Sequence, residues 1–583
     1  MKRAILTLSA AMFLLTLAAC GGGGNKPPVV PSVTISPATA NVQEGSQQQF
    51  TALVSNTSDQ AVTWQVNGVT GGNPTVGTIS ATGLYTAPAV IPNPASVTIS
   101  AFISDMVTVS GSAIVTITGV TFNNSSLKGN YVFSLNGIDG SANPFYALGA
   151  LTADGNGNVT AGEEDLIDTT SGYVTATTMT GTYTVGADGR GTLTLNNSIG
   201  QFQFAIALKS MGSTMISAVL NETDNGVVAA TGNLEAQAAS VAGPAGNYAF
   251  GFSGSGLGCG SVNSAGIFTM TGGTVGGVQD LNCGGTIVKS QTVSGSYGTI
   301  DGMGRGTGSF KGSTTGSSNM IYYVVSSGRF RFIADPNTPS FFLGSADLQT
   351  QPSFAATDFN GSYVISSSAN TNAGVSYSLI QINASGGNVS SGYFDVNDTG
   401  NQGSAALSGS YSINSNGYIA GTWNVSNGSL PFAMYLFSPK QGYYLDERTN
   451  AVGGGNVYAQ SGSVTTNAAW AGSFATRQFG YFLVNGVVNN NNASGVSGQM
   501  SADGNGKLAG TLDLNDPAGV SIGQSMQGSY SVGTVAPGRM TLSITTAVEG
   551  TRSYTGYIVN QNQVLLLETD NNLTSGGDAI RQF

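Results

Sequence analysis

A domain-sized block of sequence recurs four times along this chain of 583 residues. Each copy begins with glycine, a small polar residue and an aromatic residue, at Gly129-Asn130-Tyr131, Gly246-Asn247-Tyr248, Gly361-Ser362-Tyr363 and Gly472-Ser473-Phe474. Three further markers follow in the same order in every copy. They are an aspartate (Asp165, Asp280, Asp395, Asp513), a tyrosine (Tyr183, Tyr297, Tyr411, Tyr530) and a closing Gly-x4-Gln (Gly232/Gln237, Gly344/Gln349, Gly455/Gln460, Gly577/Gln582). Repeats of this length are whole domains and not solenoid units, so the chain must build one domain four times.

The composition indicates that this domain is made of β-strands. Only 8% of the residues are charged, against about 25% in an average soluble protein, while 40% are hydrophobic. In the first copy, Gly181–Val185 alternates like a strand, Gly186–Gly189 supplies a turn and Thr192–Leu195 returns, which predicts a hairpin. Each copy contains about eight such strands in a meander, and these tend to close into a barrel or to form two packed sheets. We favour a barrel, loosely similar to lipocalins or avidin, whose first strand also carries Gly-x-aromatic.

A different all-β domain precedes the repeats. Val33–Ser36 and Val62–Val66 alternate apolar and polar residues, and Trp64 is a candidate core residue, as expected for a β-sandwich. The opening Val-Thr-Ile-Ser-Pro, the Val-Thr-Trp-Gln-Val strand and the segment Ile79–Pro88 resemble bacterial Ig-like domains of group 2. The resemblance implies an Ig-like sandwich of the kind that serves as a stalk, spacer or adhesion module.

The N-terminus has the pattern of an export signal. Lys2 and Arg3 precede an apolar run from Ala4 to Ala19, which is too short to span a bilayer comfortably. Leu17-Ala18-Ala19-Cys20 resembles the lipobox of bacterial lipoproteins, which implies cleavage before Cys20 and a lipid anchor on it. The alternative is an ordinary signal peptide that contains a cysteine. Gly21 after the cysteine resembles outer-membrane lipoproteins, so the predicted location is a bacterial membrane, the outer membrane or cell surface.

These patterns together predict an all-β chain with an Ig-like sandwich and four barrel or sandwich domains. The predicted segments are 1–19 (signal peptide), 20–31 (lipidated tether), 32–118 (Ig-like domain), and 127–237, 245–349, 358–460 and 470–583 (β-repeats).

The chain contains no histidine and has a net charge of -11. Ser-His-Asp and Cys-His catalysis and the usual zinc sites are therefore excluded. A negative chain gains nothing from counterion release on nucleic acid, so no nucleic-acid partner is expected. We predict no catalytic residue, no metal site and no cofactor.

Three patterns leave alternatives open. Asp154–Asn158 resembles the start of an EF-hand-type calcium loop with Asp165 at its twelfth place, but Val159 stands where glycine is needed, and a hairpin turn is the favoured interpretation. The four phased aspartates are either carboxylates at the barrel mouths that hold a polar ligand, or caps of strand ends. Glu163 and Glu164 could form a carboxylate pair for glycoside hydrolysis, although neighbours on a strand point to opposite faces.

Cys259 and Cys283 are the two cysteines besides Cys20. In an exported chain they predict a disulfide, the alternative being two buried thiols.

The leading functional hypothesis is a non-enzymatic, lipid-anchored envelope protein for adhesion or matrix contact. The alternatives are a surface lipoprotein that binds polysaccharide or a small ligand and, least favoured, a carboxylate-based hydrolase. Expected partners are the membrane, through the lipid anchor only, and a glycan or surface protein.

Overall fold

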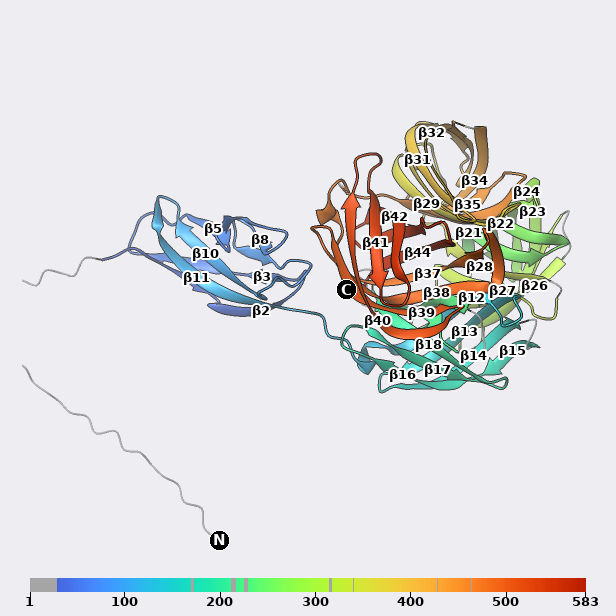
Figure 1. Ribbon diagram of the computed structural model, residues 1–583, viewed down its shortest axis with the longest axis horizontal. Coiled ribbons are helices and arrows are strands. Elements are labelled where there is room, and N and C mark those ends of the chain that lie inside the picture. Colours follow the sequence, from blue (N-terminus) through green and yellow to red (C-terminus); the bar gives the residue numbers. More distant parts are fainter. Residues whose placement is uncertain are drawn as a thin grey trace, which may run out of the picture.

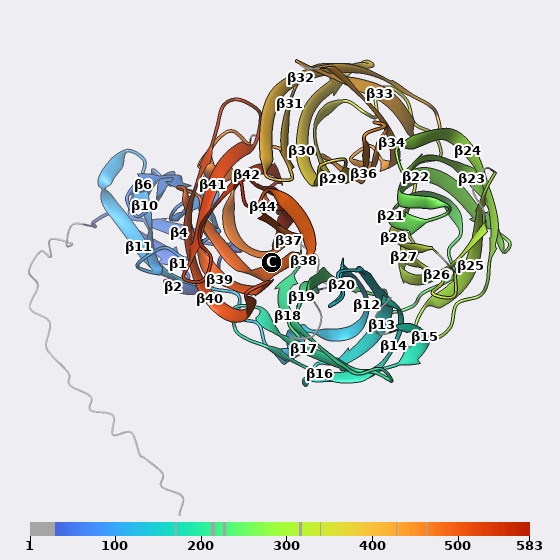
Figure 2. The same ribbon diagram turned by 45° about the vertical axis from the view of Figure 1, so that its right-hand side comes forward.

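An elongated N-terminal domain stands beside a ring of four β-barrels (Figures 1 and 2). The computed structural model describes residues 29–168, 172–210, 216–224, 229–313, 317–338, 340–426, 428–462 and 464–583. Within these ranges the only helices are two 3-10 turns, η1 (Asn124–Ser126) and η2 (Asn467–Ala469), and none is long and apolar enough to cross a membrane. The prediction of an all-β chain is confirmed.

The N-terminal domain is a sandwich of short strands. Its strands are β1 (Ser32–Ser36), β2 (Thr39–Gln43), β3 (Gln47–Gln49), β4 (Thr51–Ser55), β5 (Val62–Val66), β6 (Val69–Thr70), β7 (Gly72–Asn73), β8 (Gly77–Ile79), β9 (Leu84–Thr86), β10 (Ser96–Ile103) and β11 (Met106–Thr118). The sheet β2-β11-β10-β5-β6 faces the sheet β3-β9-β8-β7, and β1 pairs with β4. Trp64, Phe50 and Tyr85 are buried between them, because alternate residues of each strand point inward.

Each barrel is an antiparallel meander of eight strands whose last strand pairs with its first. Barrel 1 contains β12 (Lys128–Ile138), β13 (Pro144–Asp154), β14 (Asn158–Asp168), β15 (Gly172–Thr178), β16 (Thr180–Val185), β17 (Arg190–Asn196), β18 (Gln201–Lys209), β19 (Ser217–Glu222) and β20 (Ala229–Ala236). Here β15 and β16 are two segments in the place of one strand, and β20 pairs with β12 to close the barrel.

The other three barrels have uninterrupted strands. Barrel 2 contains β21 (Gly246–Gly256), β22 (Cys259–Thr271), β23 (Thr274–Cys283), β24 (Thr286–Tyr297), β25 (Arg305–Gly312), β26 (Ser317–Ser326), β27 (Arg329–Ala334) and β28 (Phe341–Leu348). Barrel 3 contains β29 (Gly361–Thr371), β30 (Gly374–Ser385), β31 (Asn388–Asp398), β32 (Asn401–Ile413), β33 (Tyr418–Val425), β34 (Gly428–Ser438), β35 (Gln441–Asp446) and β36 (Ala451–Ala459). Barrel 4 contains β37 (Ala471–Val484), β38 (Val487–Asp503), β39 (Lys507–Asp516), β40 (Gly519–Val532), β41 (Arg539–Thr546), β42 (Gly550–Asn560), β43 (Gln563–Glu568) and β44 (Leu573–Arg581).

Aromatic side chains fill the barrel interiors. A Cβ added to Gly149 would lie 2.5 Å from the Phe133 ring, and one added to Gly266 would lie 2.6 Å from Phe250, so glycine is required where each ring crosses the neighbouring strand. In barrel 3 the Trp423 and Phe432 rings stack with their centroids 3.7 Å apart.

The repeated tyrosine marker ties the start of a barrel to its fourth strand. The hydroxyl of Tyr183 donates to the Leu127 carbonyl oxygen at 2.6 Å, and Tyr530 does the same with Trp470 at 2.7 Å. Tyr411 donates to Phe359 at 2.8 Å. A buried hydroxyl needs such an acceptor, which explains why this residue recurs as tyrosine.

Barrel 2 carries a disulfide between Cys259 and Cys283, as the export pattern predicted. The bond joins the first residue of β22 to the last residue of β23, at one end of the barrel.

Candidate functional site

The phased aspartates lie between barrels. The Asp165 carboxylate of barrel 1 accepts two hydrogen bonds from Arg305 of barrel 2, at 2.7 and 2.8 Å, and a third from the Tyr323 hydroxyl at 2.7 Å. Asp395 of barrel 3 repeats this arrangement with partners in barrel 4. There Arg539 donates at 2.8 and 2.7 Å and Tyr557 at 2.6 Å.

The other two aspartates make the same connection with different partners. Asp280 of barrel 2 faces Tyr418 and Tyr435 of barrel 3, and burial raises the pKa of its carboxyl group. Asp513 of barrel 4 pairs with Arg190 of barrel 1. Because the last barrel contacts the first in this way, the four barrels form a closed ring (Figure 2).

The closing glutamines make a second set of contacts between successive barrels. Gln237 of barrel 1 donates to the carbonyl oxygens of Met303 and Val324 in barrel 2, at 2.9 and 2.7 Å. Gln349 and Gln460 make equivalent bonds from barrel 2 to barrel 3 and from barrel 3 to barrel 4. Gln582 completes the series from barrel 4 to the Asp188 carbonyl oxygen of barrel 1, at 3.0 Å.

Glycines on the inner strands allow the barrels to approach closely. A Cβ on Gly251 of barrel 2 would lie 2.7 Å from the Tyr443 ring of barrel 3, and one on Gly576 of barrel 4 would lie 2.7 Å from Tyr377 of barrel 3. Neighbouring barrels therefore pack side chain against bare backbone at these points.

All four barrels contribute to a polar region at the centre of the ring, which we call the hub. The residue after each closing glycine is polar, and these residues are Asn233, Ser345, Asn456 and Asp578. We define the hub by these four residues together with Lys209, Glu235, Arg329, Arg331, Asp347 and Arg477, whose charges interact with one another.

The hub has two adjoining cavities of about 230 and 250 Å³. Asn456 and Ser368 line both of them. Arg477 and Asp578 line the first, and Arg331 lines the second.

A network of ion pairs fixes one side of the hub. Glu235 accepts from Arg331 at 2.6 Å and lies 3.3 Å from Arg329, which also donates to Asp347 at 2.6 Å. Burial opposes the ionisation of Glu235, but the two guanidinium groups outweigh it and lower its pKa to about 2. Burial also lowers the pKa of Lys209 to about 8.

Two guanidinium groups in the hub keep free donors. The Arg477 guanidinium makes no hydrogen bond to any residue that the structure describes, and its nearest carboxylate oxygen, on Asp578, is 3.8 Å away. Arg331 uses only Nε, so both of its Nη atoms lack a partner among the same residues. Arginine donors in a cavity are suited to a carboxylate ligand.

Apolar side chains close the hub toward the tip of the β37–β38 hairpin. Tyr481, Ala493 and Val488 of barrel 4 pack with Ile138 of barrel 1 and Val375 of barrel 3. Along β37, Arg477 is followed by Phe479 and Tyr481, so the polar layer gives way to an apolar layer within one strand.

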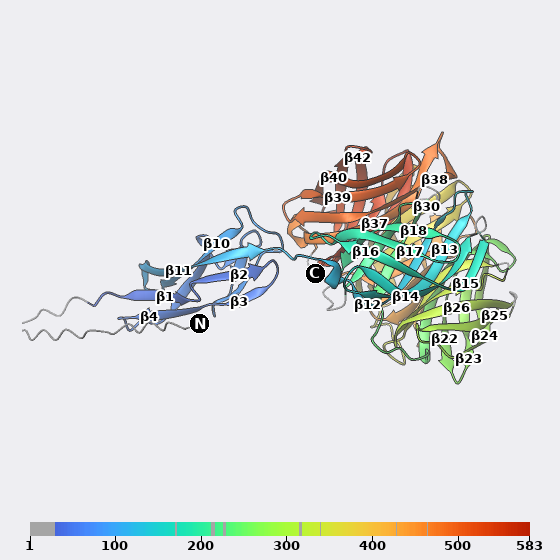
Figure 3. The same cartoon turned by 90° about the horizontal axis from the view of Figure 1, so that it is seen from below.

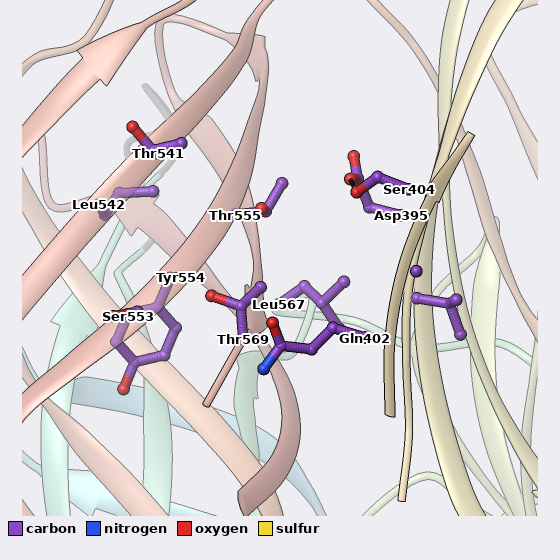
Figure 4. A pocket seen from close by; sticks show the side chains of 12 residues that line it. Asp395, Gln402, Ser404, Thr541, Leu542, Ser553, Tyr554, Thr555, Leu567 and Thr569 are labelled. Carbon is purple, nitrogen blue, oxygen red and sulfur yellow. Dashed lines mark hydrogen bonds between the residues drawn. The ribbon is translucent and has the colours of Figure 1, made fainter. Parts of the chain in front are cut away.

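A further cavity of about 340 Å³ lies away from the hub, between barrels 3 and 4. Figure 4 shows Asp395 and Ser404 of barrel 3 facing Thr541 and Thr555 of barrel 4. Asp395 is already held by Arg539 and Tyr557, which leaves this cavity with hydroxyl groups and no free charge of its own among its lining residues.

The other predicted positions are distributed as follows. Cys20 lies outside the described residues. The Asp154 carboxylate accepts from the backbone N–H of Asn156 and Asn158 within a hairpin turn, and the Asn158 hydrogen bonds lower its pKa to about 2. Asp165 is not part of that loop, since it pairs with Arg305. No group of three or more His, Cys, Asp or Glu residues that could hold a metal occurs in the described ranges.

The two adjacent glutamates point in different directions. Burial and a hydrogen bond with Asp301 of barrel 2 raise the pKa of Glu163 to about 7. Glu164 accepts from the Asn197 amide at 2.7 Å, and burial raises its pKa to about 7. They do not face a common cleft.

The hub is not among the sites predicted from the sequence. Its signal was the polar residue after each closing glycine, which is visible once the four copies are aligned. The aligned copies do not show that these four positions lie close together in space.

Comparison with known proteins identifies one part of the chain. No curated protein matches the chain. Residues 29–110 match the family model of the bacterial Ig-like domain, group 2, and the chain is therefore a bacterial Ig-like domain followed by four closed eight-stranded β-barrels.

Proposed function

We propose that this protein is an exported, lipid-anchored and non-enzymatic envelope protein that presents a rigid ring for adhesion or matrix contact. The closed ring is the observation that carries the proposal. Interface ion pairs and glutamine contacts connect each barrel to the next, including the last to the first. A closed ring presents a fixed surface, which suits contact with a large partner.

The N-terminal domain supports a stalk role in this proposal. It extends away from the ring, and its first described residues lie at the end farthest from the barrels (Figures 1 and 3). A lipid on Cys20 would precede this end by a short glycine-rich segment, so the ring would stand off the membrane. Two or three acyl chains give stable anchoring where a single chain does not.

The carboxylates support a non-enzymatic role more than a hydrolase. Asp165 is ion-paired with Arg305, and Glu163 faces Asp301 at the same interface. These groups stabilise the contact between barrels 1 and 2, which accounts for their positions without a reaction.

The anchor is tested by expressing the full chain and its Cys20→Ser variant in a two-membrane bacterium. The wild type should incorporate labelled palmitate and partition into detergent, and Cys20→Ser should do neither. The matched control is Cys259→Ser/Cys283→Ser, which removes the other cysteines and should keep the label. Labelling of Cys20→Ser would contradict the proposal.

The contact role is tested with intact cells that carry the full chain. Protease added outside should remove the ring, and cells should be retained on immobilised polysaccharide or matrix protein above the level of cells without it. Resistance of the ring to external protease would place it inside the envelope and overturn the adhesion role.

A second candidate function is the binding of a small ligand by the ring. The observation that favours it is the hub, where two polar cavities contain arginine N–H groups that make no hydrogen bond to any described residue. The two functions are compatible, because the hub is separate from the outer surface of the barrels.

A further inference from the structure

The hub carries a local excess of positive charge inside an acidic protein. Its cations are Lys209, Arg329, Arg331 and Arg477, and its carboxylates are Glu235, Asp347 and Asp578. Four cations and three anions leave one positive charge, whereas the whole chain has a net charge of -11. A small anion is therefore attracted to the hub while a long polyanion is repelled by the outer surface.

Arg477 is the most loosely paired arginine of the hub. Glu235 and Asp347 are engaged by Arg329 and Arg331, and Asp347 also accepts from the Tyr443 hydroxyl at 2.5 Å. Among the residues that the structure describes, the Arg477 guanidinium has only the 3.8 Å contact with Asp578. Its side chain is 24% exposed, so its planar donor pair is open to a carboxylate in the cavity.

The other lining groups suit a ligand rich in hydroxyl groups. Ser366, Ser367 and Ser378 line the cavity that contains Arg477, and Ser368 and Asn456 extend the same chemistry into the adjoining cavity. Tyr377 and Tyr458 add aromatic surface to the first cavity. Hydroxyl and amide groups both donate and accept, as do the hydroxyl groups of a sugar.

We propose that the hub binds one short acidic saccharide, whose carboxylate pairs with Arg477 and whose hydroxyl groups bond the serines and Asn456. This inference rests on the second candidate function, ligand binding by the ring, and it is independent of the lipid anchor. The two adjoining cavities, of about 230 and 250 Å³, together fall within the range of about 300–1,000 Å³ that is typical of small-molecule sites, which suits a ligand of about two sugar units.

The test is calorimetric titration of the soluble mature chain, which begins after Cys20, with three probes. These are digalacturonate, its neutral counterpart galactobiose, and citrate as an anion without a sugar ring. Digalacturonate should bind with one site per chain, at least tenfold more tightly than either of the others, and more weakly at high salt.

Two hub variants and one matched control locate the site. Arg477→Gln should weaken digalacturonate binding at least tenfold. Asn456→Asp, at an exposed position, should weaken it similarly by charge repulsion and keeps the test available if Arg477→Gln does not fold. Arg448→Gln, at a similarly exposed arginine paired with Asp446 in barrel 3, should change affinity less than twofold.

Each alternative result is decisive. Equal binding of digalacturonate and galactobiose would retain ligand binding but overturn the carboxylate assignment. Citrate binding as tight as digalacturonate binding would overturn the saccharide assignment. Equal loss in Arg477→Gln and Arg448→Gln would remove the hub as the site. No binding of any saccharide would overturn the inference, and no binding of citrate either would overturn the second candidate function as well.

Discussion

Arg190 and Asp513, 323 residues apart in the chain, form the ion pair that joins the last barrel to the first, with Nε of Arg190 3.2 Å from Oδ2 of Asp513. The Asp513 side chain is 1% exposed. It also accepts the backbone N–H of Gly523 at 2.8 Å. Asp513 lies at a β-bulge in β39 of barrel 4, and Arg190 is the first residue of β17 in barrel 1. The ion pair thus joins these two points.

Arg190→Gln is expected to open the ring between barrels 4 and 1. Removing one partner leaves a buried carboxylate unpaired, which typically destabilises by about 3–5 kcal/mol. Amide hydrogen exchange should increase in β18 and β20 of barrel 1 and in β38 of barrel 4, on which both of them pack across this interface. The double variant Arg190→Gln/Asp513→Asn should recover part of the loss, because the neutral side chains can still hydrogen bond. Unchanged exchange in these strands would show that the pair does not hold the ring closed.

Gln582→Ala should loosen a smaller part of the same interface. The variant loses the hydrogen bond to the Asp188 carbonyl oxygen, and a single bond of this kind contributes about 0.5–1.5 kcal/mol. Faster exchange is expected at the turn of residues 186–189, as measured by mass spectrometry. Gln561→Ala, on the exposed turn after β42, is the control and should have no effect there. An equal effect of both variants would contradict the role assigned to Gln582.

Reduction of the Cys259–Cys283 disulfide should destabilise barrel 2 selectively. The bond closes a loop with a sequence separation of 24 residues, for which loop entropy predicts about 3–4 kcal/mol. Reduction should raise the mass by two hydrogens, and Cys259→Ser/Cys283→Ser should lower the unfolding midpoint by the same amount as reduction. Two thiols that react with an alkylating reagent in the untreated protein would contradict the bond.

Buried Glu164 should make the ring less stable as the pH rises. Burial raises the pKa of Glu164 in the folded protein to about 7. Its contribution to the free energy of unfolding is therefore fully present below pH 4.5, the pKa in the unfolded chain, and is lost as the pH rises through 7. The full change is about 3 kcal/mol for a shift of this size. Glu164→Gln keeps an acceptor for Asn197 and should flatten the dependence of the unfolding midpoint between pH 5 and pH 8. The exposed control Asp105→Asn should leave the slope unchanged, and an unaltered slope in Glu164→Gln would reject the assignment.

Local sequence was sufficient to predict the domains. The alternation of Gly181–Val185 and the turn Gly186–Gly189 specify a hairpin through interactions between near neighbours. The repeated tyrosine marker is explained within one barrel, because Tyr183 bonds to Leu127. Gly149 makes room for Phe133 in the same barrel. The tyrosine contact recurs in three of the four copies, so the repeated pattern itself reveals it.

The role of the phased aspartates could not be predicted in the same way. Asp165 was considered as a barrel-mouth ligand or a strand cap, because its own copy shows only its place on a strand. Its partner Arg305 lies in the next copy, and the equivalent residue in the copy after that is Tyr418. When its partner lies in another copy, an ion-paired aspartate cannot be distinguished by sequence from one that binds a ligand.

By itself the sequence determined the all-β class, the division into one Ig-like domain and four equal domains, and the absence of histidine chemistry, because each depends on composition or on contacts between residues close in the chain. Only the tertiary structure decided that the four barrels close into a ring and that Arg477, Asn456 and Arg331 meet at its centre. The physical reason is that the angle at which one barrel packs on the next accumulates over four interfaces. Whether Asp513 of the last barrel lies close enough to pair with Arg190 of the first depends on the packing angles at all the interfaces together.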